Sequence, residues 1–308
     1  MIFRYALSNG KFSETEESTD STWIRLAKPT ENELEQISKE TGIEIDDLKE
    51  NQSRDKGSMF KSEPEYTMTL LDVPYINSNG RSFYNTRSIM IICTKRGVVT
   101  VSQKRNDVVD DFINNPPKNL SSDNLTGLQF QLILSIMNRY CKYINKINQM
   151  RRDIEKNLNV NVNDVDIYNL HQMESSLIYF ITSVKSFLPI LDKMQKFYGE
   201  LTNDNADLFE DMRIRATQAF DLSTIYKEVI MGTRDLFNTM VSNKLNAVMK
   251  TLTVITLVLS VPLLVAGIYG MNVDLPMDTH QYGFIFVCAL MIVFTAMALL
   301  TLRKKRII

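Results

Sequence analysis

Two long runs without a charged side chain, close to the C-terminus, constrain this chain more than any other feature. They cover residues 251–273 and 281–302. About 20 helical residues cross the roughly 30 Å hydrocarbon core of a bilayer, and each run reaches that length. A hairpin buried in a soluble core is the alternative, but core helices are usually shorter and carry a polar stripe. We therefore expect two transmembrane helices.

Basic residues beside these runs predict how the chain crosses the membrane. Lys244 and Lys250 precede the first run, and residues 303–306 are all Lys or Arg, whereas residues 271–282 contain neither. Cytoplasmic flanks of membrane helices are enriched in Lys and Arg. We expect a multi-pass protein of the plasma (inner) membrane with both termini in the cytoplasm and a short loop outside.

The composition of the whole chain conceals this division. The net charge is −1, but residues 1–243 carry −5 and residues 244–308 carry +4. An acidic body argues against a nucleic-acid partner, which would require a basic face. The N-terminal residues lack the apolar core of a secretory signal. The three cysteines are far apart and match no metal-binding spacing, which indicates free thiols in a reducing compartment. They are Cys93, Cys141 and Cys288.

The first part of the cytoplasmic chain alternates strand-like and helix-like patterns. A short strand is expected from Trp23, followed by a helix that Thr30 and Glu33 begin with capping-box spacing. Runs rich in β-branched residues predict further strands at 65–75, 88–94 and 97–103, with turns at Asn79-Gly80 and Arg96-Gly97. Consecutive prolines at 116 and 117 then mark a boundary, because they continue neither a helix nor a central strand.

The chain after these prolines has helical spacing of its apolar residues. We expect helices from residue 121, over 165–198 with Pro189 inside, and from about 207 to 267, the last about 90 Å long. A helix that long needs neighbours, either the preceding helices or copies of itself. The expected segments are an α/β domain (1–118), a helical stalk (119–249), a first transmembrane helix (250–270), an outer loop (271–281), a second transmembrane helix (282–302) and a basic cytoplasmic tail (303–308).

One face of the first transmembrane run collects nearly all of its polar and small side chains. Steps of three and four residues connect Asn246, Met249, Thr253, Thr256, Ser260, Leu263 and Gly267. Such a line is typical of closely packed membrane helices. It is also what a pore wall requires, if identical helices from several subunits turn it toward a shared axis. A step of about 3.5 residues is the seam of a parallel helical assembly, which favours an oligomer but leaves both interpretations open.

The outer end of this run carries the sequence Tyr269-Gly270-Met271-Asn272. Together with two C-terminal spans, a short outer loop and a terminal basic run, it resembles the CorA-type divalent-metal transporters. The segments SNKLNAVMKTLTVIT (242–256) and WIRLAKPT (23–30) are similar to that family as well. The resemblance implies a funnel-shaped homopentamer with a cytoplasmic α/β domain, a long helical stalk and five first spans around the pore.

The resemblance also implies roles for particular residues. Gly270, Met271 and Asn272 would form the selectivity filter, and Asp274 and Asp278 would lie at the pore mouth. The pore-lining residues would be Asn246, Met249, Leu252, Thr253, Thr256, Ser260 and Leu263. Asn246 and Met249, with either Leu252 or Thr253, would form the inner constriction. A regulatory metal ligand in the stalk helix would correspond to Asp211. Its partner would come from a neighbouring subunit, with Asp107, Asp110 and Asp111 as candidates.

The expected function is Mg²⁺ influx gated by intracellular metal, with Mg²⁺ as transported and regulatory ion and no organic cofactor. The chain departs from the family at Leu263, where many members have Thr after the proline, and in the outer loop, where His280 stands. A Zn²⁺ or Co²⁺/Ni²⁺ transporter of the same fold is therefore an alternative, as is a non-transporting membrane scaffold or sensor. The expected partners are divalent ions, membrane lipid and copies of the chain. No enzyme motif is present, so we do not expect catalysis.

Overall fold

The computed structural model describes residues 1–8, 10–16, 22–50, 57–77, 82–117, 120–122, 124–157, 164–199, 203–273, 276 and 281–304. The chain divides into two compact units, Met1–Arg234 and Asp235–Ile308. The finer division at residue 118 into an α/β domain and a stalk stays a prediction.

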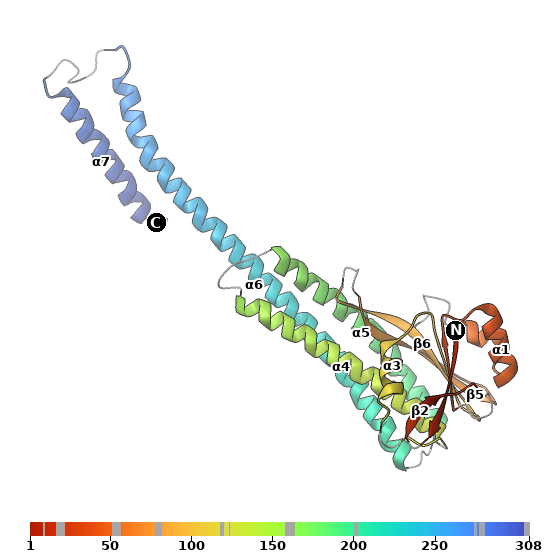
Figure 1. The fold of residues 1–308 in the computed structure, drawn as a ribbon. Coiled ribbons are helices and arrows are strands. Elements are labelled where there is room, and N and C mark those ends of the chain that lie inside the picture. The colour runs from red at the N-terminus through yellow and green to blue at the C-terminus, as the bar shows by residue number, and fades with distance from the viewer. Residues whose placement is uncertain are drawn as a thin grey trace. The chain divides into compact units, whose positions relative to one another are not determined.

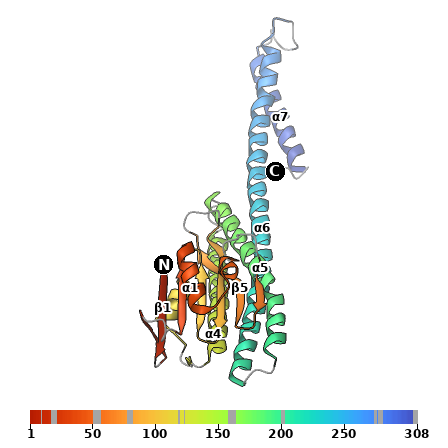
Figure 2. The same ribbon diagram turned by 90° about the vertical axis from the view of Figure 1, so that its right-hand side faces the viewer.

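A seven-stranded sheet forms the framework of the first unit (Figures 1 and 2). Its strands are β1 (Ile2–Ser8), β2 (Lys11–Glu14), β3 (Trp23–Ala27), β4 (Met59–Ser62), β5 (Tyr66–Ile76), β6 (Tyr84–Thr94) and β7 (Val98–Ser102). They lie in the order β2-β1-β3-β7-β6-β5-β4. Strands β3 and β7 are parallel, with Trp23 beside Val98, whereas the other neighbours are antiparallel.

One face of the sheet is covered by α1 (Glu31–Thr41) and α2 (Ile45–Lys49). Leu34 and Ile37 of α1 pack with Ile24 and Leu26 of β3 in a closed apolar core. The expected capping box is confirmed: the Glu33 amide donates to the Thr30 hydroxyl, and the Thr30 amide donates to the Glu33 carboxylate at 2.7 Å.

The opposite face carries the larger core. It packs against α3 (Asp107–Asn114), α4 (Leu125–Asn157), α5 (Asp164–Tyr198) and the first part of α6 (Asn203–Tyr269) (Figure 2). Trp23 is fully buried in this core, and its indole N–H donates to the Thr100 hydroxyl at 2.9 Å. Adjacent residues of β3 thus point to opposite faces, as the pleat of a strand requires.

Two helices are long and apolar enough to cross a membrane, α6 and α7 (Gly283–Lys304). The expectation of one helix from the stalk into the first span is confirmed, because α6 runs from Asn203 to Tyr269 with Pro262 inside it. The expected helix with an internal proline at 189 is also present as α5.

The structure adds elements that the local pattern did not indicate. The hairpin of β1 and β2 and the short strand β4 were not expected, and β6 begins four residues before the predicted run. Helix α4 begins at Leu125 rather than 121, because the Asn124 side chain caps it by accepting from the Gly127 amide at 2.8 Å. The predicted turn at Asn79-Gly80 lies outside the described residues, whereas Arg96-Gly97 does join β6 to β7.

Candidate pore-lining helix and its Gly-Met-Asn end

The end of α6 and the whole of α7 lie side by side in the unit Asp235–Ile308 (Figures 1 and 2). A cavity of about 430 Å³ between the two helices is lined by apolar side chains that include Val261, Val265 and Phe294. Val265 is only 4% exposed. Large side chains elsewhere on both helices remain open, such as Leu259 and Phe284 at 67% and 82% exposure. Surfaces this apolar require lipid or further helices to cover them.

The polar line predicted from the sequence lies on the side of α6 that α7 leaves open. Its members are all exposed: Asn246, Met249, Leu252, Thr253, Thr256, Ser260, Leu263 and Gly267. The residues that face α7 are instead Val261, Leu264, Val265 and Ile268. Within one chain the line therefore has no partner among the described residues and is available to another copy or to water.

The hydroxyl groups on this line all bond to their own helix. Thr253 donates to the Met249 carbonyl at 2.8 Å, and Thr256 donates to the Leu252 carbonyl at 2.8 Å. Ser260 donates to the Thr256 carbonyl at 2.6 Å. A hydroxyl whose proton is used in this way keeps its oxygen lone pairs as acceptors. The line therefore offers neutral hydrogen-bond acceptors, with no carboxylate among them.

The Gly-Met-Asn sequence begins where α6 ends. The Gly270 amide donates to the Ala266 carbonyl at 2.9 Å, and the Met271 amide donates to the Ile268 carbonyl at 3.2 Å, which tightens the last turn. A Cβ atom at Gly270 would lie 3.1 Å from the Ala266 oxygen, so a larger residue would press on backbone. Met271 and Asn272 are exposed directly after this turn.

The expected pore-mouth residues are not placed by the structure. Asp274, Asp278 and His280 lie outside the described residues. Their roles stay predictions from the sequence.

The expected regulatory acid Asp211 is exposed on the first part of α6, next to the buried Met212. In the described part of the chain, no three His, Cys, Asp or Glu side chains gather as a metal site would require.

Two of the three candidate partners of Asp211 are engaged by arginines. Asp110 accepts from Arg25 at 2.5 Å and from Arg105 at 2.9 Å, and Asp111 pairs with Arg139. Burial raises the pKa of Asp110, but the hydrogen bonds from Arg25 and Arg105 outweigh it and hold that pKa below its usual value. Asp107 is exposed and forms no ion pair among the described residues, which makes it the most available of the three.

An apolar line on the first part of α6 was missed in the sequence. Ile214, Ile225 and Val229 are 53%, 51% and 39% exposed, and this part of α6 belongs to the unit Met1–Arg234. Their helical spacing was the available signal, but it was hidden because buried residues such as Met212 and Ile230 follow the same period. Exposed apolar side chains along a helix indicate an interaction surface.

Comparison with known proteins identifies a family and relatives that match nearly the whole chain. The family model described as "CorA-like Mg2+ transporter protein" matches residues 18–304. The cobalt/magnesium transport protein CorA of Methanocaldococcus jannaschii is 23% identical over 277 residues, which cover 88% of this chain and 86% of that protein. The protein of the same name from Thermotoga maritima is 22% identical over 302 residues, covering 94% and 84%.

A solved structure shares the fold over nearly the full length. The complete structure of the CorA magnesium transporter from Methanocaldococcus jannaschii superposes with a TM-score of 0.83 at 21% sequence identity. The match covers 99% of this chain and 98% of the other. The succession of an N-terminal unit with a β-sheet, a long helix and two candidate C-terminal membrane helices is therefore that of a full-length CorA chain.

Proposed function

Because the chain belongs to the CorA-like Mg²⁺ transporter family, we propose that it moves Mg²⁺ into the cytoplasm through a pore shared by several copies. The observation that carries the proposal is the exposed line of neutral acceptors on α6. It passes through Thr253, Thr256 and Ser260, and the Gly-Met-Asn sequence follows it at the end of the helix.

Neutral acceptors suit the chemistry of this ion. Mg²⁺ dehydrates reluctantly and usually keeps several of its waters. The waters of a cation turn their hydrogens outward, so the wall around a hydrated ion must accept hydrogen bonds. A ring of Asn272 side-chain oxygens with the Gly270 carbonyls would form the filter, and Met271 would support it by packing. The hydroxyl oxygens would then conduct the hydrated ion inward.

The cytoplasmic half of the line is more apolar and is proposed as the gate. Met249 and Leu252 are 56% and 55% exposed in the single chain, and Asn246 lies one turn before them. A ring of such side chains closes a pore by excluding water. Leu263 would contribute a second apolar ring nearer the outside.

The pore requires several copies of the chain, and we propose the homopentamer that the resemblance to CorA-type transporters implies. Two surfaces support an oligomer: the open line on the distal part of α6, and the exposed apolar line through Ile214, Ile225 and Val229. Each copy would cover the apolar surface of the next. Membrane lipid would cover the outward side of α7.

The proposed orientation places both termini in the cytoplasm of a cell bounded by the plasma (inner) membrane. Lys244 and Lys250 precede the first span, and Arg303 and Lys304 end α7, so both cytoplasmic flanks are basic. Asp274 and Asp278 would then concentrate cations at the outer mouth.

Regulation by internal Mg²⁺ is proposed at Asp211. The exposed carboxylate would share a metal ion with Asp107 of a neighbouring copy, because Asp110 and Asp111 are already paired. Metal bound between subunits would favour the closed state, and loss of metal would release it.

Co²⁺ is a second candidate substrate, because two relatives are named cobalt/magnesium transport proteins. Zn²⁺ and Ni²⁺ remain further alternatives, and a scaffold without transport is the rival from another class. The decisive experiment measures flux of Mg²⁺, Co²⁺, Zn²⁺ and Ni²⁺ into proteoliposomes, with and without a proton gradient. Transport of Mg²⁺ without a proton gradient supports the proposal, and absence of flux for all four ions supports the scaffold.

A further inference from the structure

A cavity of about 450 Å³ lies at one end of the only parallel strand pair in the described sheet, β3 and β7. Its lining includes Ala27 and Lys28 at the end of β3, and residues 103–105 directly after β7. The carboxyl ends of parallel strands lie at the same edge of a sheet. The cavity therefore borders those ends and extends from them along β1, where Phe3 and Tyr5 line it.

The two strands also send the chain to opposite faces at this point. After β3 the chain enters α1, whose Leu34 packs on the face of Ile24. After β7 it enters α3, whose Phe112 packs on the face of Trp23. Where the segment after β3 and the segment after β7 turn to opposite faces, a crevice opens between them. In open α/β sheets, ligands bind in such a crevice.

The chemistry of the lining is cationic over an apolar floor. Arg25, Lys28, Lys104 and Arg105 supply four positive side chains. Phe3 and Tyr5 of the neighbouring strand β1 are half-buried and supply aromatic rings. The volume falls in the range of about 300–1,000 Å³ that small-molecule sites occupy.

A buried donor in this lining has no partner. Arg25 is only 4% exposed, and its Nη1 is bonded to Asp110, but its Nη2 finds no hydrogen-bond partner among the described residues. A buried guanidinium nitrogen left without a partner is unfavourable, because it has lost its hydrogen bonds to water. Asn106, directly after the lining residue Arg105, also buries an Nδ2 without a partner in the described chain. Both nitrogens are donors buried beside the lining, so they add to the excess of donors around the cavity.

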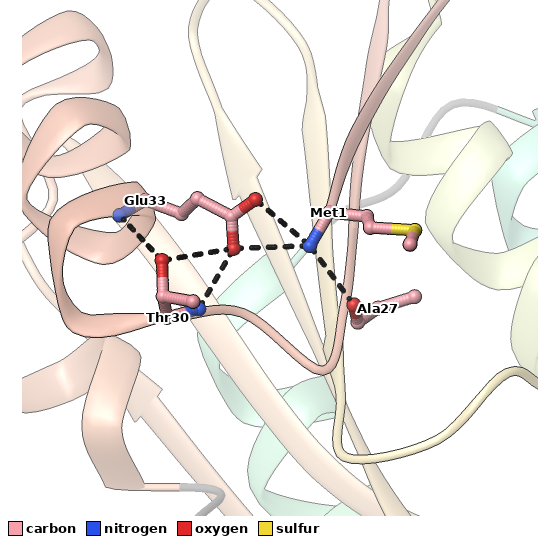
Figure 3. A network of polar contacts seen from close by, with 4 residues as sticks. All are labelled: Met1, Ala27, Thr30 and Glu33. Carbon is pink, nitrogen blue, oxygen red and sulfur yellow. Dashed lines mark hydrogen bonds and ion pairs between the residues drawn. The ribbon is translucent and has the colours of Figure 1, made fainter.

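The rim of the cavity is held by backbone contacts and a polar network. Lys28 has a left-handed backbone with φ of 49°, and its amide donates to the Ser102 carbonyl at 2.8 Å, which links the ends of β3 and β7. Figure 3 shows the Met1 amine between the Ala27 carbonyl and the Glu33 carboxylate, with the amide and hydroxyl of Thr30 bonded to the same carboxylate.

Carboxylates near the cavity do not cancel its charge. Asp110 is held between Arg25 and Arg105, and Glu33 is held by the Met1 amine and the Thr30 amide. Asp107 is exposed beyond Arg105. Lys28 and Lys104 are exposed and form no ion pair among the residues described.

We propose that this cavity binds a small organic anion, a phosphate or carboxylate that carries a flat ring, with the ring against Phe3 and Tyr5. Lys28 and Lys104 hold the charged group from the rim. The site is separate from the conducting helix and adds a soluble ligand to the partners of this transporter.

The test measures binding to the full chain in lipid nanodiscs by calorimetry. The probes are adenosine 5′-monophosphate and phenyl phosphate for a phosphate head, benzoate for a carboxylate head, and inorganic phosphate without a ring. The main variant is Lys28→Asn combined with Lys104→Ala, since Asn tolerates the left-handed backbone. Lys95→Ala at the opposite end of β7 is the control, because Lys95 is an exposed lysine outside the cavity lining, paired with Glu65. Arg25→Gln is used only if its unfolding temperature shows that it folds.

We expect at least one ring-bearing probe to bind with a Kd below about 1 mM. Binding should weaken about tenfold in the double variant, as loss of charged hydrogen bonds predicts, and stay unchanged in Lys95→Ala. Comparison of phenyl phosphate with benzoate then identifies the charged head. The proposal is wrong if no ring-bearing probe binds or if the double variant of Lys28 and Lys104 binds the probes with unchanged affinity. It is also wrong if inorganic phosphate and phenyl phosphate bind with equal affinity.

Discussion

Ser260 donates its hydroxyl proton to the carbonyl oxygen of Thr256, 2.6 Å away, and Thr256 donates its own to Leu252. Both hydroxyl oxygens are thereby left as acceptors on the exposed side of α6. In the proposed pore these oxygens would accept hydrogen bonds from the waters of a hydrated cation, whereas carboxylates would bind the ion directly.

Replacement of Thr256 by Val should reduce Mg²⁺ flux by about tenfold, because each subunit loses an acceptor worth about 1 kcal/mol. Thr251→Val is a matched control. Thr251 makes the same bond, to the Ala247 carbonyl at 3.0 Å, but lies on the opposite side of the helix. Flux in proteoliposomes should separate the two variants, and equal losses would show that the line is only a packing surface.

Replacement of Gly270 by Ala should disturb the filter without preventing assembly. The added Cβ would lie 3.1 Å from the Ala266 oxygen, so the last turn of α6 must shift. We expect a clear loss of Mg²⁺ flux with the oligomer intact in size-exclusion chromatography. Gly232→Ala is the control, since a Cβ there meets nothing within 4 Å. It should raise the free energy of unfolding by about 0.5–1 kcal/mol and leave flux unchanged.

Much of this architecture was predictable because its signals are local. The capping box of Thr30 and Glu33, the charge-free runs and the polar line each lie within a few turns of the chain. The sheet order was not predictable, since the pairing of Trp23 with Val98 joins residues far apart in sequence. The burial of Arg25 in the cavity lining was not predictable for the same reason. A charged residue in a strand normally faces solvent, and only its contact with Asp110, 85 residues away, accounts for its burial.

Replacement of Asp110 by Asn should lower the free energy of unfolding by about 2 kcal/mol at neutral pH, because Arg25 loses its buried counter-ion. The folded pKa of Asp110 is lowered, since the hydrogen bonds of two arginines outweigh burial. Its contribution is therefore present above the unfolded pKa of about 3.9 and is lost as pH falls through the lower folded value.

The free energies of unfolding of this variant and of the wild type should therefore become equal at acidic pH. Chemical denaturation at several pH values measures both. Asp111→Asn serves as the comparison, because Asp111 is 59% exposed and its pair with Arg139 is worth less than about 1 kcal/mol. A deficit for Asp110→Asn that persists unchanged at the lowest pH would contradict the role of its charge.

Replacement of Asp211 by Asn should weaken inhibition by internal Mg²⁺, since a carboxylate that holds metal between subunits is lost. Flux should continue at internal Mg²⁺ concentrations that close the wild type. Asp221→Asn, another exposed acid of α6, should keep the normal response. A wild-type response in the Asp211 variant would remove this residue from the regulatory site.

The most direct measurement is Mg²⁺ uptake by proteoliposomes that contain the Asn272→Ala variant, with assembly checked by native mass spectrometry. Asn272 is exposed directly after the last turn of α6, so its loss should not disturb folding. Our proposal predicts that uptake is abolished while the oligomer keeps its size. Uptake at the wild-type rate by a correctly assembled variant would contradict the proposed pore.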